Sequence, residues 1–346
     1  MNEDQVTSRR RFLGTAAGAT GVALAAAVWK PAQAAAAVPE QGPRHPSPIR
    51  SYVSGNFFLQ LEGLKAGFLK AVDGGNITAE VIEESVGSSY YVHKHIGNPK
   101  YEDLSLRLGL GMNKAVYSWI SAQWTGQSER KNGAVIAADF KGDAQSQREF
   151  FNALITEVGI PACDASSKEV GYLTLNLTPE YTRDAKASGT FAVAKSEQKL
   201  WLPSNFKLEI DGLDCTRVNK VDAFTVKQTV VTDDIGDSRD YEREPGKVEF
   251  PNLKVTFAEV SAQSWISWHK DFLIDGNSGQ EQEKSGRLVF LSPTLTEELL
   301  EIKFFNLGIF SLKQEKAESN SDAIKRMAAE LYCERMEFNY KVGAIA

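Results

Sequence analysis

Cysteine and histidine are scarce in this chain, which has only three cysteines and four histidines among 346 residues. Cys163, Cys215 and Cys333 form no Cys-x-x-Cys pair and have no spacing typical of a metal site. One thiol would be left over after any single disulfide, and domains of this size rarely depend on a disulfide framework. We therefore expect three reduced cysteines, buried as small apolar side chains.

The motifs of common enzyme classes are missing as well. The sequence has no Gly-x-Ser-x-Gly, no phosphate-binding glycine loop and no His-Glu-x-x-His. His93 and His95 would share one face of a strand and could bind a metal. The third ligand could be Glu102 or Asp103, but we favour two exposed loop histidines. The prediction is a protein that is not an enzyme and has no catalytic residues, no cofactor and no metal site.

An excess of basic residues is also lacking, because 39 Lys and Arg stand against 45 Asp and Glu, giving a net charge of −6. Neutralising nucleic-acid phosphates needs clustered Lys and Arg, so the composition argues against a nucleic-acid-binding surface. Acidic residues instead crowd one stretch: Asp233, Asp234, Asp237, Asp240, Glu242 and Glu244. Their order does not match the twelve-residue calcium loop, so we favour a solvated loop over a calcium site.

The N-terminal region resembles a bacterial export signal. Its basic start carries four residues of a twin-arginine type consensus: Arg9, Arg10, Phe12 and Leu13. The apolar run at residues 15–28 is too short and too rich in glycine for a membrane span, and a small-residue cleavage site follows at Ala34. We interpret residues 1–34 as a signal peptide that exports the folded protein to the periplasm or beyond, and residues 35–50 as a flexible tether. The alternative is a chance basic N-terminus on a cytoplasmic protein.

What the chain does have is internal repetition. The alternating strand pattern at residues 56–64 recurs at 205–213, which is 149 residues later. The pattern at 104–108 recurs at 253–257 with the same offset. Agreement in order and spacing indicates that one module was copied within the chain.

A short amphipathic helix follows in both copies. Asn113 and Ser261 are expected to cap these helices, and Trp119 and Trp268 lie on them, again 149 residues apart. Most other aromatic residues fall at periodic positions and are expected in the core. Two are candidates for exposure: Trp124 and Trp201.

The end of each module supports the same division. Residues 150–152 recur at 304–306, now 154 residues later, which a five-residue insertion explains. The predicted fold is mainly β, with two tandem antiparallel β-barrel or sandwich domains that each carry one short α-helix. The domains are expected at residues 51–184 and 203–346, with a linker at 185–202.

An ordered series of features in the first module resembles a known family. A Pro-x-x-x-x-Leu-x-Leu-x-x-Gly strand at residues 99–109 is followed by a helix with a central Trp119. Next come a strand opened by Arg130 and Lys131 and a Phe-Phe-Asn-Ala motif at 150–153. The series looks like the tail tube protein family of contractile phages and phage-derived injection systems. That family shares its fold with the secreted tube protein of type VI systems.

The resemblance implies a ring of barrels, and rings that stack into a tube. Two fused modules would build a six-barrel ring from a trimer. Stacking would use the loops at residues 83–101 and 232–250, and for it we predict ion pairs between acidic and basic residues of neighbouring rings. The candidates are Asp233, Asp234 and Asp237 on one side and Lys65, Lys70, Arg130 and Lys131 on the other. The partners are then other copies of this chain and other tail or injection-system proteins.

A structural, self-assembling tube or ring protein that is exported in the folded state is the predicted function. The alternative is a monomeric extracytoplasmic binding protein with a concave apolar site between two β domains. A secreted hydrolase would need a triad or metal site that the sequence does not reveal. If the signal is a false one, assembly would take place in the cytoplasm, as for phage tails.

Overall fold

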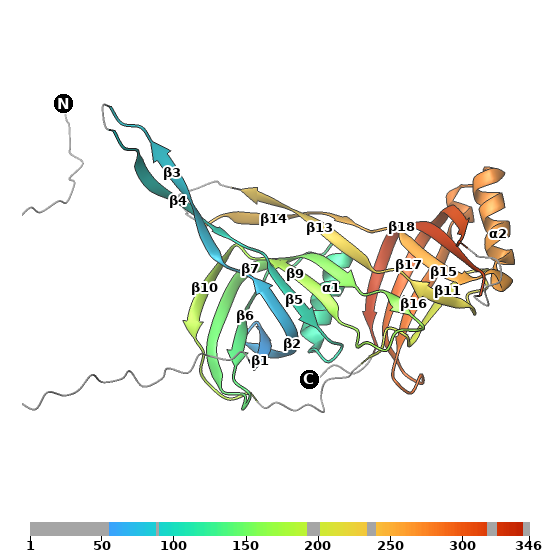
Figure 1. Ribbon diagram of the computed structural model, residues 1–346, viewed down its shortest axis with the longest axis horizontal. Coiled ribbons are helices and arrows are strands. Elements are labelled where there is room, and N and C mark those ends of the chain that lie inside the picture. The colour runs from blue at the N-terminus through green and yellow to red at the C-terminus, as the bar shows by residue number, and fades with distance from the viewer. Residues whose placement is uncertain (1–54, 88–89, 192–200, 234–239, 317–323, 342–346) are drawn as a thin grey trace, which may run out of the picture. The chain divides into compact units, whose positions relative to one another are not determined.

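The computed structural model describes residues 55–87, 90–191, 201–233, 240–316 and 324–341 (Figure 1). The predicted signal peptide, the tether and two candidate contact residues, Asp234 and Asp237, lie outside the described residues. All described residues belong to one compact unit, residues 52–346. Within them, no helix has the length and apolar character needed to span a membrane.

Strands of the first half close into a barrel. Around the barrel the order is β7-β6-β1-β2-β5-β9, and β9 pairs with β7 again. The bounds are β1 (Asn56–Leu61), β2 (Leu64–Gly74), β5 (Leu104–Leu108), β6 (Lys131–Ala138), β7 (Ala144–Ile160) and β9 (Leu173–Thr178). Beyond β9, β10 (Tyr181–Lys186) continues along β7. Alternation explains these strands, because every second residue of β5, namely Leu104, Leu106 and Leu108, is fully buried.

The second half forms an open sheet with a matching strand order. Its order is β11-β16-β17-β18-β15-β12-β8. The bounds are β11 (Phe206–Ile210), β12 (Val218–Val221), β15 (Leu253–Ala258), β16 (Lys284–Leu291), β17 (Glu298–Gln314) and β18 (Arg326–Tyr340). Among the described residues β11 and β12 do not pair, whereas their counterparts β1 and β2 do.

The mainly β fold is therefore confirmed, but the second barrel is not closed. The physical reason lies in β12, a strand of only four residues. Its outer edge pairs with β8 (Cys163–Asp164), a strand of the first half, so that edge does not reach β11. The predicted linker at residues 185–202 starts within the last two residues of β10 and ends before β11, and strands from both sides of it share each large sheet.

Each half also has a long hairpin that overlaps one of the predicted loops at residues 83–101 and 232–250. The first consists of β3 (Ile77–Glu84) and β4 (His93–Tyr101), and the second of β13 (Phe224–Asp233) and β14 (Glu242–Glu249). The loop interpretation is wrong for residues 93–101, which form β4, and for residues 242–249, which form β14. Only Tyr101 of β4 is buried, so this strand has no buried face to impose an alternating pattern.

Irregularities of the backbone recur at equivalent places. The register of β7 with β9 shifts between Ile155 and Glu157, and that of β17 with β18 shifts between Ile309 and Ser311. The two shifts are 154 residues apart, as the sequence motifs are. Each long strand also has one asparagine at positive φ, 49° and 55°: Asn152 and Asn306.

The two helices begin differently. α1 (Lys114–Trp124) is capped as predicted, because Asn113 Oδ1 accepts a hydrogen bond from the Ala115 amide at 2.9 Å. α2 (Gln263–His269) has no side-chain cap, so the prediction for Ser261 is wrong. Ser261 lies in the 3₁₀ turn just before the helix, too early to reach the first free amides.

Trp124 and Trp201 are buried, 2% and 0% exposed, so their predicted exposure is also wrong. The Trp124 ring packs edge-on against Phe338 of β18, with ring centroids 5.4 Å apart. The Trp201 ring packs in the same way against Phe290 of β16, at 4.8 Å. For Trp124, the covering residue belongs to the other half of the chain.

The three cysteines are free, as predicted, and Cys163 and Cys333 are buried while Cys215 is half-buried. Burial raises the pKa of each thiol, to about 11 for Cys215 and Cys333. A protonated thiol is a weak nucleophile, so the cysteines behave as small apolar side chains.

Candidate assembly surfaces

The second hairpin adds a strand to the sheet of the first half. Residues 224–227 of β13 pair with residues 157–160 of β7. Val226 and Val158 are opposite each other in this pairing and both are fully buried. Lys227 Nζ lies 3.0 Å from Glu157 Oε1 at the end of the paired segment. A strand from one half thus covers an edge of β7 that would otherwise be open.

Arg130 holds β14 against the first barrel. Its guanidinium donates to the Arg243 carbonyl at 2.7 Å, pairs with Glu244 and lies 3.6 Å from Glu180. Glu180 is 9% exposed and also accepts from Asn152 Nδ2 at 2.6 Å and from the Arg243 amide at 3.3 Å. Burial lowers the pKa of the Arg243 guanidinium, while Asp103 and Glu180 act in the opposite direction. Glu180 is therefore the acceptor at which both halves meet.

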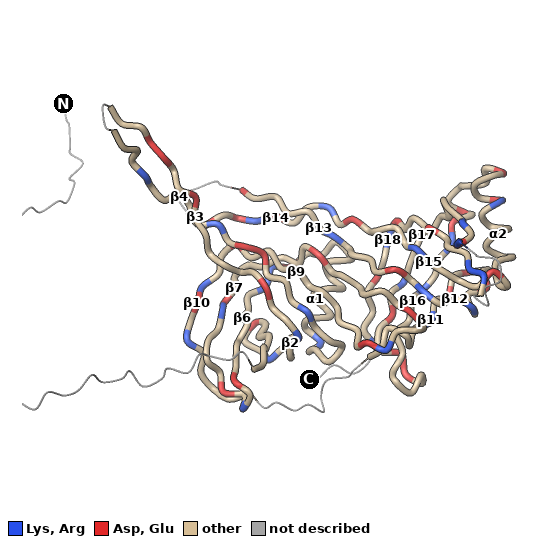
Figure 2. Tube along the Cα trace, viewed as in Figure 1, with Lys and Arg blue, Asp and Glu red and all other residues tan. Residues whose placement is uncertain are grey.

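A second polar cluster joins the root of the first hairpin to the tip of the second, where Asp240 lies between β13 and β14. The Tyr101 hydroxyl, at the end of β4, donates to Asp240 Oδ1 at 2.6 Å and accepts from Arg183 Nη1 at 2.9 Å. Arg183 Nη2 also lies 3.3 Å from Asp240 Oδ2. Burial, together with the bond to Asp240, raises the pKa of Tyr101, so its phenol remains a donor at neutral pH. Figure 2 shows the mixture of basic and acidic residues along β13 and β14 that makes such pairing possible.

Arg130 is the predicted contact residue that meets the second hairpin, and it does so within the same chain. Its neighbour Lys131 pairs with Glu129 at 2.8 Å. Sequence reasoning missed four members of these clusters: Glu180, Arg243, Tyr101 and Arg183. They are far apart in the chain and share no motif, so only the folded arrangement identifies them.

The remaining candidates are not brought together. Lys65 Nζ lies 5.0 Å from the centre of the Phe191 ring, and Lys70 is exposed on β2. Asp233 ends β13 opposite Glu242 of β14. Ion pairs between neighbouring rings through these residues stay a prediction.

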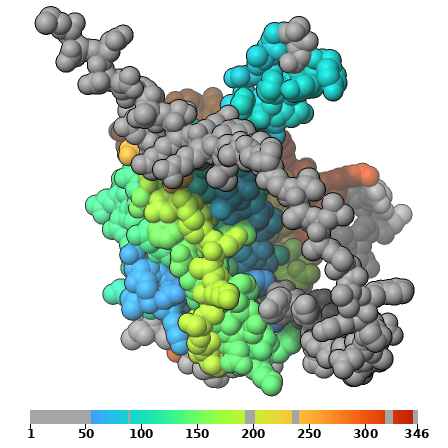
Figure 3. All heavy atoms as spheres, turned by 90° about the vertical axis from the view of Figure 1, so that its left-hand side faces the viewer, coloured from blue at the N-terminus to red at the C-terminus, as the bar shows by residue number. Residues whose placement is uncertain are grey.

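The first hairpin differs from the second because it stands apart from both large sheets. In Figure 3 it forms the cyan projection beside the green strands. β3 and β4 make a two-stranded sheet of their own, and no other described strand pairs with either. Large apolar side chains are exposed on it: Ile77 at 48%, Val81 at 57%, Ile82 at 48% and Ile96 at 74%. Large exposed apolar residues on a hairpin with open outer edges are typical of a surface that another chain covers.

His93 and His95 lie on β4 and not in a loop, which corrects one part of that interpretation. His95 Nε2 is 3.7 Å from Glu84 of the facing strand. Among the described residues no group of three metal-ligating side chains occurs here or elsewhere. The other charged residues of the hairpin pair across it, as Lys94 does with Glu83 at 2.6 Å.

An open edge also exists on β17. β16 pairs with β17 only as far as Leu307. From there to Gln314, β17 has β18 on one side and no partner strand on the other among the described residues. Phe310 on this segment is 39% exposed, and the Ser311 hydroxyl is buried without a hydrogen-bond partner in the described part of the chain.

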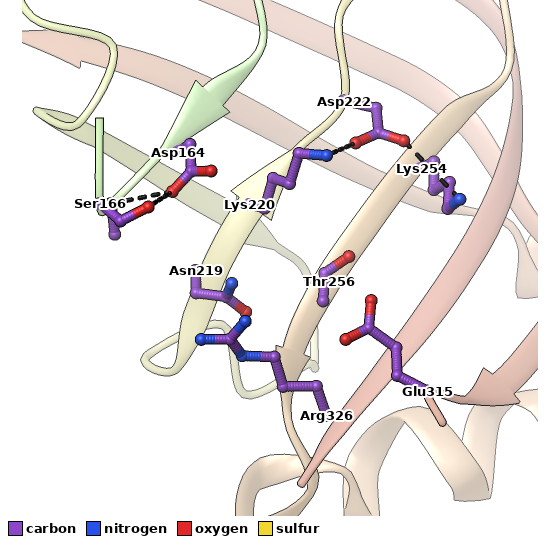
Figure 4. A pocket seen from close by; sticks show the side chains of 10 residues that line it. Asp164, Ser166, Asn219, Lys220, Asp222, Lys254, Thr256, Glu315 and Arg326 are labelled. Atoms are coloured by element: carbon purple, nitrogen blue, oxygen red, sulfur yellow. Dashed lines mark hydrogen bonds and ion pairs between the residues drawn. The ribbon is translucent and has the colours of Figure 1, made fainter. Parts of the chain in front are cut away.

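A polar hollow of about 320 Å³ lies where β8 meets β12 and β15 (Figure 4). Lys220 Nζ is 2.7 Å from one oxygen of Asp222, and Lys254 Nζ is 3.8 Å from the other. Asp164 accepts from the amide and the hydroxyl of Ser166, and these bonds lower the pKa of Asp164. Lys220 and Lys254 thus both pair with Asp222, and the hydroxyl of Ser166 faces the Asp164 carboxylate. The hollow is not the concave apolar site that a monomeric binding protein was expected to have.

Comparison with known families gives one match in the first half of the chain. Residues 53–183 match the model of the T4-like virus tail tube protein gp19. Curated proteins give no match.

Chains of several solved structures match part of this chain. One chain in the sheath-tube complex of an extracellular contractile injection system, PVC, is 20% identical to this chain, with a TM-score of 0.34. The match covers 42% of this chain and 95% of the PVC chain. The tube-terminating cap of the anti-feeding prophage is 20% identical with a TM-score of 0.36, over 42% and 99%. Hcp1 from Flavobacterium johnsoniae is 12% identical with a TM-score of 0.23, over 39% and 96%.

Proposed function

We propose that this chain, whose residues 53–183 match the T4-like tail tube family, is a structural subunit that assembles with copies of itself into rings or tubes. The observation that carries the proposal is the family match, which coincides with the closed barrel of the first half. The open strand edges of the first hairpin and of β17 support it, because exposed edges need a covering partner. The working residues of such a protein lie at strand edges and not in a catalytic centre.

The second half is a diverged copy of the first. Its strands pair in the same order, and its register shifts lie at equivalent positions. Such agreement supports tandem duplication, because unrelated β domains have no reason to share their irregularities. Divergence then shortened β12 and left the second barrel open.

Two modules in one chain halve the number of chains that a ring needs. Six modules of tail-tube type would come from three chains, arranged head to tail around an axis. The contact of β13 with β7 is the model for a contact between neighbouring modules. Sheath and cap proteins of an injection system are further candidate partners, as in the PVC and anti-feeding prophage assemblies.

The chain reaches its place of assembly through the twin-arginine route. The support comes from Arg9, Arg10, Phe12 and Leu13 and from the small residues before Ala34. This route carries proteins that are already folded, so the first barrel can close before export. Assembly then takes place in the periplasm or outside the cell.

The test is the oligomeric state of the mature chain, residues 35–346, measured by light scattering and negative-stain electron microscopy. Rings or tubes are the expected result. A monomer at all protein concentrations would overturn the proposal and favour the alternative, a monomeric extracytoplasmic binding protein.

A further inference from the structure

The contact between the halves of one chain is a template for a contact between chains. In the template, β13 is the donor strand and the last residues of β7 are the acceptor edge. The central pair is Val226 opposite Val158, both fully buried. Each half of the chain contains one such hairpin and one long strand with such an edge. Within the described residues, only the hairpin of the second half and the long strand of the first half pair with each other.

The unused donor is the first hairpin. β3 and β4 correspond to β13 and β14 with an offset of 149 residues. The register agrees pair by pair, since Thr78 opposite Lys100 corresponds to Lys227 opposite Glu249. The register shift agrees as well, because it follows Ala79 in one hairpin and Gln228 in the other. By this equivalence Ile77 takes the place of Val226.

The unused acceptor is the open edge of β17. β7 and β17 correspond with an offset of 154 residues and share the register shift described above. The pairing of β6 with β7 ends at Ala153, and the pairing of β16 with β17 ends at Leu307. The next segment of each long strand therefore has no partner from β6 or β16 on that edge. On β7 the segment is covered by β13. By this equivalence Leu312 takes the place of Val158.

We infer that residues 75–78 of one chain, which lead into β3, pair antiparallel with residues 311–314 of β17 in the next chain, with Ile77 opposite Leu312 and Thr78 opposite Ser311. This inference rests on the proposed function, because it supplies the contact that links the chains of a ring. Ile77 is 48% exposed in the single chain and becomes buried, as Val226 is. The Ser311 hydroxyl, without a partner among the described residues, gains the Thr78 hydroxyl as its neighbour across the strands.

The root of the hairpin is a tight turn that only glycine fits. Gly74 and Gly75 precede β3, with φ of 81° and 72°, a conformation that residues with a Cβ rarely adopt. A Cβ on Gly74 would lie 2.0 Å from the Asp103 carbonyl oxygen. The contact is heterologous, so a closed ring forms only if the rotation per chain closes on itself.

Cysteine pairs test the register. In a Cys215→Ser background, Thr78→Cys with Ser311→Cys should form disulfides between chains under mild oxidation, because opposed residues have the short separation that a disulfide needs. A matched positive control is Lys227→Cys with Glu157→Cys, which should form a disulfide within one chain. A matched negative control is Thr78→Cys with Lys313→Cys, which is displaced by two residues. Covalent dimers and trimers on a non-reducing gel are the expected result for the first pair alone.

Three outcomes separate the claims. Rings with the disulfide between residues 78 and 311 support the inference. Rings without that disulfide, or with more of the displaced one, overturn the pairing but leave the proposed function standing. No rings, with the control disulfide within the chain still forming, overturn both, because the protein is then folded and does not assemble.

Discussion

Glu180 shows how much one carboxylate can decide at the contact between the halves. It is nearly buried and accepts hydrogen bonds from Asn152 and from the Arg243 amide, with Arg130 close by. A buried acceptor with several charged or polar donors contributes more than an exposed ion pair, because its loss leaves those donors without partners. The sequence gives no sign of this, since Glu180 belongs to no motif.

We expect Glu180→Ala to lower the free energy of unfolding by roughly 2 kcal/mol, because its donors lose a buried acceptor. Urea denaturation followed by circular dichroism measures the change. Glu244→Ala is the matched control: its side chain is 61% exposed, so the ion pair with Arg130 should contribute less than about 1 kcal/mol. Equal losses in both variants would contradict the central role of Glu180.

Cys215 should react slowly and with a steep pH dependence in the native protein. Burial raises the pKa of its thiol to about 11, and the thiolate is the species that reacts. The rate of maleimide labelling should then rise about tenfold per pH unit between pH 8 and pH 10. Mass spectrometry of the labelled protein gives the rate. A plateau near pH 9 would mean that the thiol has an ordinary pKa.

At the scale of the elements, sequence reasoning succeeds where one face of a strand is buried. β5 alternates because its inward residues are in the core, and α1 begins at Asn113 because that side chain caps it. It fails for β4, of which only Tyr101 is buried, and for Ser261, which lies too early to cap α2. The open second sheet could not be predicted, since pairing between distant strands leaves no local pattern.

Equivalent positions on the two hairpins should respond differently to the same change. Val226→Ala should lower the free energy of unfolding by about 2 kcal/mol, because Val226 is fully buried against β7. Ile77→Ala should leave the stability of the single chain within about 0.5 kcal/mol, because Ile77 is exposed there. It should nevertheless weaken assembly, as seen by sedimentation velocity. If Ile77→Ala assembles like the original chain, β3 does not carry the contact.

For the whole molecule, the N-terminal arginines should decide location. Arg9→Lys together with Arg10→Lys should abolish export and leave the precursor in the cytoplasm, because the receptor reads the arginine pair. Arg11→Lys is the control and should be exported. Cell fractionation with immunoblotting gives the result, and export of the double variant would remove the twin-arginine route from the proposal.

The described residues of both halves should also unfold together. Buried residues of the two halves form one continuous core cluster, and α1 contributes to it by stacking Tyr117 on Tyr340 of β18 at 3.8 Å. Strand exchange adds to the coupling, because β8 extends the second sheet and β13 extends the first. A single calorimetric transition is therefore expected, in contrast to the two transitions of independent domains. Tyr117→Ala should shift that transition as a whole and increase hydrogen exchange in β15 as well as in β5. Two separate transitions, or a change confined to the first half, would mean that the copied modules remain independent within the chain.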